Sequence, residues 1–176
     1  MSNDNLSFTR PVHVTDIPGA GRHFNITTAA EERALVARQL GLPAIAELTA
    51  KLTVTPFRKE GLAVDGTVRA RLTQICVVSA DNFESMVEAP VIIRFSPDGR
   101  DPNAEFDLAE LNGPEAEDPP DLLIGGVIDL GDIVREFLAL ALDPYPRKPG
   151  AEFAAPGEEA GLSPFAALNA LKNKSE

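Results

Sequence analysis

The chain of 176 residues contains one cysteine, two histidines, one tyrosine and no tryptophan. Cys76 stands alone, so the chain has no intrachain disulfide and no metal site built from several cysteines. No stretch reaches the roughly 18 to 20 apolar residues that a membrane span needs. The opening residues, MSNDNLSFTRPVHV, lack the basic and apolar regions of a secretory leader. We therefore expect a cytoplasmic protein with no membrane partner.

Residues suited to catalysis are also few. His13 falls in a proline-containing edge strand and His23 beside a glycine, where surface histidines are commoner than general bases. The sequence has no G-x-x-x-x-G-K-[ST] or G-x-S-x-G motif, and Gly125-Gly126 predicts a bend. Cys76 is expected to be a buried structural thiol on the face of Leu72, because nothing cationic adjoins it. We predict no enzyme, no cofactor and no metal.

The net charge is -11, which argues against a protein that holds DNA or RNA through a broad phosphate footprint. Between Asp98 and Asp121 nine acids stand against one base, Arg100, so residues 98–121 hold -8 of this charge. Such a run is more typical of a solvated connector than of a metal site. We expect a mobile acidic loop at 98–121.

Two helices are predicted. The first covers residues 28–40, because Thr28-Ala-Ala-Glu31 forms a capping box and Gly41 is a stop signal. The second covers 130–142, with Asp129 as its N-cap. Its apolar residues follow the i, i+3, i+4, i+7 rule and are expected in the core: Leu130, Ile133, Val134, Phe137, Leu138, Ala141 and Leu142.

The other apolar runs predict strands. Residues 6–14 and the end of GAGRHFNI are short candidates, whereas 48–57, 62–78 and 83–95 alternate with period two. Gly66 is read as a bulge, Pro90 as a break in the third long strand, and 122–129 as a further strand. We therefore predict an α+β fold: a curved antiparallel β meander or partly closed barrel with both helices packed against it.

The predicted organisation has three parts. Residues 1–148 form a single α+β domain that includes the acidic loop 98–121. Residues 149–162 are a flexible linker, and 163–176 form a short C-terminal helix capped by Ser163. In the long strand 62–78, Arg69 and Arg71 project on the outward face and are candidate RNA contacts. The alternative is a solvated face balanced by Asp65.

Three segments carry a resemblance to a known family. They are VDGTVRARLTQICVVS at 64–79, IDLGDIVREFLALALDPYP at 128–146 and SPFAALNALK at 163–172. Together they resemble the YceD family of bacterial and chloroplast proteins, named for accumulation of 23S ribosomal RNA. The resemblance implies a role in synthesis, processing or stability of 23S rRNA in a family without established catalysis or cofactor. Many relatives carry Cys-x-x-Cys where this chain has Cys76-Val-Val-Ser79, so zinc is not expected here.

The resemblance is strongest along the polar edge of the second helix and in the Tyr145-Pro146 pair that follows it. We interpret this edge as a partner-binding surface, with a purely structural motif as the alternative. Its residues are Asp129, Asp132, Arg135, Glu136, Tyr145, Pro146, Pro164 and Phe165.

These observations lead to one functional hypothesis and one alternative. The hypothesis is a non-enzymatic ribosome biogenesis factor that supports 23S rRNA as an acidic adaptor. Its partner is a basic ribosomal or rRNA-processing protein, and its contact with 23S rRNA is direct or indirect. The alternative is a β-rich small-ligand or protein-binding module unrelated to RNA. An enzyme of RNA metabolism is disfavoured because acid/base and metal constellations are missing.

Overall fold

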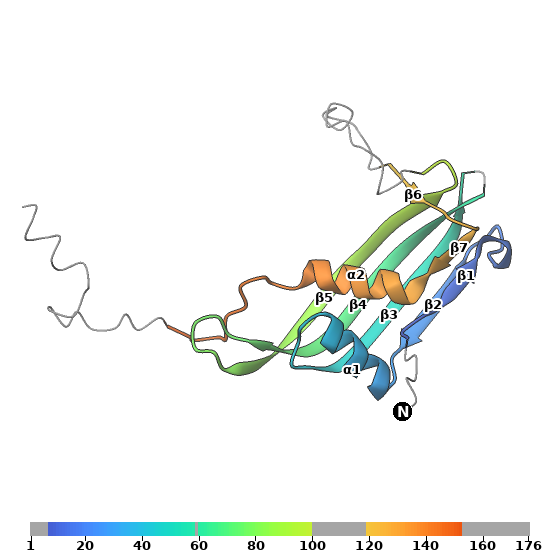
Figure 1. Cartoon of the computed structure of the whole chain (residues 1–176). Coiled ribbons are helices and arrows are strands. Elements are labelled where there is room, and N and C mark those ends of the chain that lie inside the picture. Colours follow the sequence, from blue (N-terminus) through green and yellow to red (C-terminus); the bar gives the residue numbers. More distant parts are fainter. Residues whose placement is uncertain (1–6, 59, 100–118, 153–176) are drawn as a thin grey trace, which may run out of the picture.

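A computed structural model describes residues 7–58, 60–99 and 119–152. These residues form a five-stranded mixed sheet of order β2-β3-β4-β5-β6, a two-stranded sheet β1-β7 and two α-helices (Figure 1). The predicted α+β class and antiparallel meander are confirmed. The sheet is open and does not close into a barrel.

Three long strands form the centre of the larger sheet. They are β3 (Ala44–Phe57), β4 (Gly61–Ile75) and β5 (Asn82–Ser96), and each pairs antiparallel with the next along the chain. The predicted period-two alternation is confirmed, because Leu48 and Val68 are buried whereas Thr49 and Arg69 are exposed. The meander therefore has an apolar inner face and a polar outer face.

Short strands complete the two sheets. β2 (Arg22–Thr27) pairs with β3, and β6 (Asp121–Leu122) runs parallel to the end of β5. β1 (Pro11–His13), which a 3-10 turn at Val14–Asp16 follows, pairs antiparallel with β7 (Val127–Asp129).

Both predicted helices are present and pack on the meander. α1 (Ala30–Gln39) contacts β3, and α2 (Leu130–Ala141) lies across β4 and β5 (Figure 1). The helices join one hydrophobic core with the inner face of the sheet. Their largest contributors with complete burial are Val36, Leu130, Val134 and Leu138. The predicted stripe of α2 is confirmed except at Ala141, which is exposed, and its members Phe137 and Leu142 are partly buried against the core.

The start of α1 differs from the predicted capping box. The N-cap is Ala29, and Glu32 accepts a hydrogen bond from the Ala29 backbone N–H at 2.9 Å. Thr28 lies one residue earlier and is buried, with its hydroxyl donating to the Leu48 carbonyl at 2.9 Å. The Thr28 hydroxyl therefore bonds a strand carbonyl and does not cap the helix. The prediction that placed the capping box at Thr28 and Glu31 is wrong by one residue.

Gly66 is not a bulge. It stays in register between Leu52 and Val91, and the register shift lies between Ile45 and Glu47. An added Cβ at Gly66 would come within 2.1 Å of the Lys51 carbonyl oxygen. The glycine therefore permits a close approach of neighbouring backbones.

Three predicted strand boundaries are also corrected. Pro90 does not interrupt β5. It pairs opposite Thr67, and on the other side of β5 the described residues supply only β6, at Phe95 and Ser96. The predicted strand 122–129 is two strands in different sheets, because Gly125 and Gly126 both take positive φ and turn the chain. The strand predicted at 6–14 is confined to Pro11–His13.

Several predictions lie outside the described residues. They are most of the acidic loop 98–121, the greater part of the linker 149–162, and the C-terminal helix 163–176 with Pro164 and Phe165.

Candidate functional site

The N-terminus of α2 is held by one carboxylate. Asp129 Oδ1 accepts backbone N–H groups from Gly131 at 2.7 Å and Asp132 at 3.4 Å, so the predicted N-cap is confirmed. The same oxygen accepts the backbone N–H of Arg10 at 2.7 Å. Asp129 therefore has a structural role, because its Oδ1 already accepts these three backbone hydrogen bonds.

Gly131 explains why this motif is compact. It is buried, and a Cβ there would lie 2.2 Å from the Phe8 carbonyl oxygen. The neighbouring Leu130 N–H donates to the Arg10 carbonyl at 3.0 Å. The first turn of α2 and the N-terminal segment thus need a residue without a side chain at this position.

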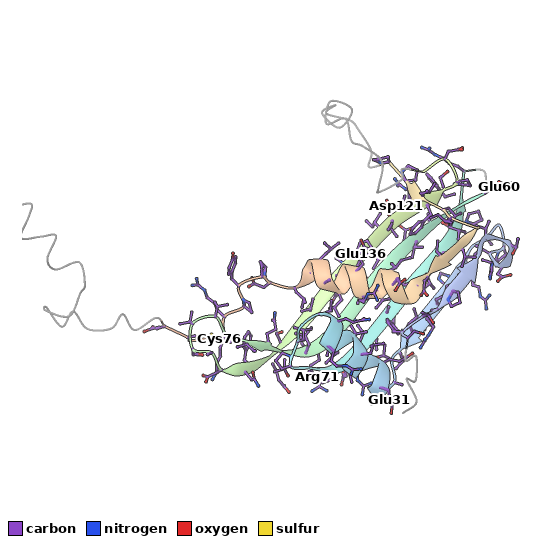
Figure 2. The ribbon with its side chains drawn as sticks, viewed as in Figure 1. Glu31, Glu60, Arg71, Cys76, Asp121 and Glu136 are labelled. Carbon is purple, nitrogen blue, oxygen red and sulfur yellow. The ribbon has the colours of Figure 1, made fainter. Side chains whose placement is uncertain are left out.

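The solvent side of α2 carries a row of residues spaced by four. Asp132, Glu136 and Leu140 are all exposed, and Leu140 keeps 74% of its surface. Figure 2 shows Glu136 on the outer side of the helix. This row, which we call the acidic face of α2, combines two carboxylates with one large apolar side chain.

Arg135 lies beside the acidic face and is committed to neighbours. Its Nη2 pairs with Asp132 Oδ1 at 2.9 Å, three residues earlier on the same helix. Its Nη1 donates to Gln39 Oε1 of α1 at 3.4 Å. The arginine therefore ties the two helices together at their exposed edge.

In the segment after α2, Pro146 has a structural role and Tyr145 is exposed. The carbonyl of Pro146 accepts the Val77 N–H at 2.9 Å and so fixes this segment to the turn after β4. Tyr145 remains 72% exposed, and its backbone N–H donates to Asp143 Oδ1 at 2.8 Å. Of this pair, Tyr145 is the one whose side chain is accessible to a partner.

Cys76 lies just after β4, at the start of the turn to β5, and not within a strand as predicted (Figure 2). Its burial is confirmed, since 1% of it is exposed. Hydrogen bonds from the Ser79 hydroxyl and from backbone N–H groups of Lys148, Ser79 and Val78 lower the pKa of the thiol to about 6, although burial opposes them. Local sequence could not indicate this lowering of the pKa, because one donor, Lys148, belongs to the segment after α2.

Arg69 and Arg71 occupy the outer face of the sheet, as predicted. Arg69 Nε lies 3.0 Å from Glu88 Oε2, and Arg71 Nη2 lies 2.6 Å from Glu47 Oε1. The balancing carboxylates come from the two flanking strands and not from Asp65. Each arginine presents a neutralised pair instead of a free cation.

Two hollows lined by described residues are open to solvent. A groove of about 700 Å³ lies between α1 and the start of β3, and a cleft of about 360 Å³ separates β1 from β2. The groove includes Glu31, Arg33 and Arg38, and the cleft has Arg10 as its charged residue. Neither hollow places a nucleophile beside a general base.

Two other kinds of feature are absent from the described ranges. No group of three or more histidine, cysteine or acidic side chains is placed to hold a metal ion there. Among the described helices, none is long and apolar enough to cross a membrane.

Comparison with known proteins gives one match. A family model described as large ribosomal RNA subunit accumulation protein YceD matches residues 64–172. The match covers more than half of the chain, from β4 through β5 and all of α2. No curated protein and no solved structure matches the chain.

Proposed function

Because the chain belongs to the YceD family of large ribosomal RNA subunit accumulation proteins, we propose that it acts in biogenesis of the large ribosomal subunit. The family match is the observation that carries this proposal. In the finer form of the proposal, the protein supports 23S rRNA without catalysis, as an adaptor for a basic ribosomal or rRNA-processing protein in the cytoplasm.

The acidic face of α2 supports the proposal that the chain is an adaptor for a basic protein. Its carboxylates are Glu136 and Asp132, which is paired with Arg135, and their row on the helix ends at Leu140, which is 74% exposed. Carboxylates beside an apolar side chain complement a Lys/Arg-rich surface with an apolar pocket. Tyr145, just beyond the helix, adds an exposed aromatic residue of the kind that anchors interfaces.

Charge favours a protein partner over bare RNA. The chain carries -11 overall, which repels a polyanion and attracts a basic protein at long range. The candidate RNA contacts Arg69 and Arg71 already have carboxylate partners at 3.0 and 2.6 Å. Their pairing would have to be broken before either one met a phosphate.

Depletion of the protein tests the biogenesis role. We expect 23S rRNA to fall relative to 16S rRNA, measured on total RNA, and to recover when the wild-type chain is supplied again. An unchanged ratio would instead favour the alternative, a small-ligand or protein-binding module unrelated to RNA.

Charge-swapped variants test the adaptor. Asp132→Arg with Arg135→Asp keeps the ion pair and the net charge but reverses their positions on α2. We expect this variant to fold normally and to restore 23S rRNA poorly. The matched control swaps an exposed pair on the outer face of the sheet, Arg69→Glu with Glu88→Arg, and should restore 23S rRNA fully.

The opposite pattern has a clear meaning. A defect with the sheet swap but none with the helix swap would overturn the adaptor in favour of direct RNA contact. The purified chain should then also bind naked 23S fragments tightly and with strong salt dependence.

A further inference from the structure

Strand β5 has a long edge that pairs with no other strand among the described residues. It pairs with β4 from Asn82 to Phe95, whereas its other side meets β6 only at Phe95 and Ser96. Between Glu84 and Arg94 no described strand pairs with that side, and Figure 1 shows β5 as the outermost long strand of the meander. An edge of this length offers a row of backbone donors and acceptors to another strand.

The residues along this edge are nearly palindromic about Ala89. The sequence FESMVEAPVIIRF places a residue and its mirror partner at equal distances from that alanine. The matching pairs are Phe83 with Phe95, Glu84 with Arg94, Met86 with Ile92, and Val87 with Val91. A strand with this symmetry is complementary to a second copy of itself that runs antiparallel.

The outward side chains are those expected of such a contact. Met86 and Ile92 are 83% and 67% exposed, although both are large and apolar. Glu84 and Arg94 lie on the same outer face, outside them along the strand, and the Arg94 guanidinium lies 5.7 Å from the centre of the Phe57 ring. Glu88 and Pro90 lie between Met86 and Ile92 on this face, so two apolar residues and two residues of opposite charge are placed symmetrically about its middle.

Pro90 sets the direction of the backbone groups. A proline in a ladder is tolerated where its missing N–H would point away from the neighbouring strand, so Pro90 directs its carbonyl to the free edge. Because this direction alternates along an antiparallel strand, Glu84, Met86 and Ile92 also turn their N–H and C=O groups outward. Those groups are available for a second ladder, from which one bond per copy is missing at Pro90.

We propose that a second copy of this chain pairs antiparallel with β5 about a two-fold axis at Ala89. In that register Glu84 lies opposite Arg94 of the second copy, and Met86 lies opposite its Ile92. β6 ends the pairing on both sides because it already occupies the edge at Phe95. The two meanders join into one continuous sheet, independently of the role in ribosome biogenesis.

The register decides between a second copy and an unrelated strand. With the axis at Ala89, Glu84 lies opposite Arg94 and Met86 lies opposite Ile92 at the same time. An unrelated peptide would not be expected to carry the matching residues at these positions. Edge pairing buries less than the roughly 1,200 Å² of a stable complex, so the dimer is weak and concentration-dependent.

Sedimentation equilibrium of the full chain, from about 1 to 300 µM, tests the proposal. The wild type should dimerise. Glu84→Arg and Arg94→Glu should each weaken the dimer roughly tenfold, because like charges then face each other at both ends. The double variant should regain wild-type affinity, and a mixture of the two single variants should form a heterodimer. Circular dichroism melts check that each variant folds.

Cysteine cross-linking tests the register. With Met86→Cys and Ile92→Cys in one chain, mild oxidation should give a disulfide-linked dimer, since the two thiols face each other across the axis. Either substitution alone should not cross-link, because identical positions are then about 20 Å apart along the strands. Both side chains are exposed, so neither change affects the core.

Two outcomes would overturn the proposal. If the wild-type chain stays monomeric over the whole concentration range, β5 does not pair with a second copy. A dimer that tolerates both charge reversals and forms no cross-link uses a different surface.

Discussion

Asp129 accepts a hydrogen bond from the backbone N–H of Arg10 at 2.7 Å, across 119 residues of chain. The same carboxylate oxygen accepts the Gly131 N–H at 2.7 Å, so one atom caps α2 and fastens the strand β1. Arg10 continues the connection to α1, since its Nη2 pairs with Glu32 Oε1 at 2.7 Å. The N-terminal segment thus joins both helices through side-chain charges.

Asp129→Ala should lower the free energy of unfolding by about 2 kcal/mol, because a helix cap and a partly buried charged acceptor are lost together. Urea unfolding followed by circular dichroism measures the loss. Asp129→Asn keeps an acceptor oxygen and should cost distinctly less. Equal losses for both variants would show that the negative charge matters and that the capping geometry does not.

Gly66→Ala should destabilise the protein by about 2 to 4 kcal/mol, because the new Cβ meets backbone that cannot move aside. The nearest atom is the Lys51 carbonyl oxygen in β3, at 2.1 Å. The matched control is Gly19→Ala, whose Cβ meets nothing within 4 Å. Thermal melts should show a clear drop for the first variant and almost none for the second.

Local patterns predicted the strands and α2 well, since burial on one face repeats every two or every 3.6 residues. They could not predict which distant backbone groups complete a site. The Arg10 contact with Asp129 and the Lys148 contact with Cys76 depend on how the chain returns on itself. Thr28 was misassigned for the same reason, because its hydroxyl is used by Leu48 of β3.

The exposure of the candidate site residues could be predicted in part. The exposure of Asp132, Glu136 and Tyr145 follows from their positions off the apolar stripe or beyond the helix end. Pro146 looked equivalent in the sequence, yet its carbonyl is bound to the turn after β4. A motif that holds the backbone and a surface for partners differ in their backbone contacts, which only the folded structure shows.

Stability should depend on pH through Cys76. The pKa of its thiol is about 6 in the folded protein against an ordinary value of 9.0. A group with a lowered folded pKa contributes fully above its unfolded pKa and loses that contribution as the pH falls toward the folded pKa. Stability should therefore rise from pH 6 to pH 9 in the wild type, and Cys76→Ala should flatten this rise in urea titrations.

Ser79→Ala tests the cause of the lowered pKa of the Cys76 thiol. It removes the hydroxyl donor, which is the largest cause of the lowered pKa of Cys76, and leaves the cysteine in place. The thiolate absorbance near 240 nm should then appear at higher pH than in the wild type. Coincident titration curves would contradict the assigned cause.

Leu140→Glu should weaken binding of the basic partner about tenfold or more, since it removes the apolar anchor of the acidic face of α2. Folding should be unaffected, because Leu140 is 74% exposed. Ile124→Glu is the matched control, as Ile124 is 77% exposed but does not belong to α2. Recovery of 23S rRNA in depleted cells should fail with the first variant and succeed with the second.

The pairing of β1 with β7 has a consequence for synthesis. At roughly 5 to 20 residues per second, Asp129 leaves the peptidyl transferase centre about 6 to 24 s after Arg10. The β3, β4 and β5 hairpins can form in that interval, since each needs only neighbouring chain. During it, the N-terminal strand has neither its β7 partner nor the carboxylate that fastens it. β1 is therefore synthesised first but is among the last strands to pair. The nascent chain completes its fold only after residue 129 has left the ribosome.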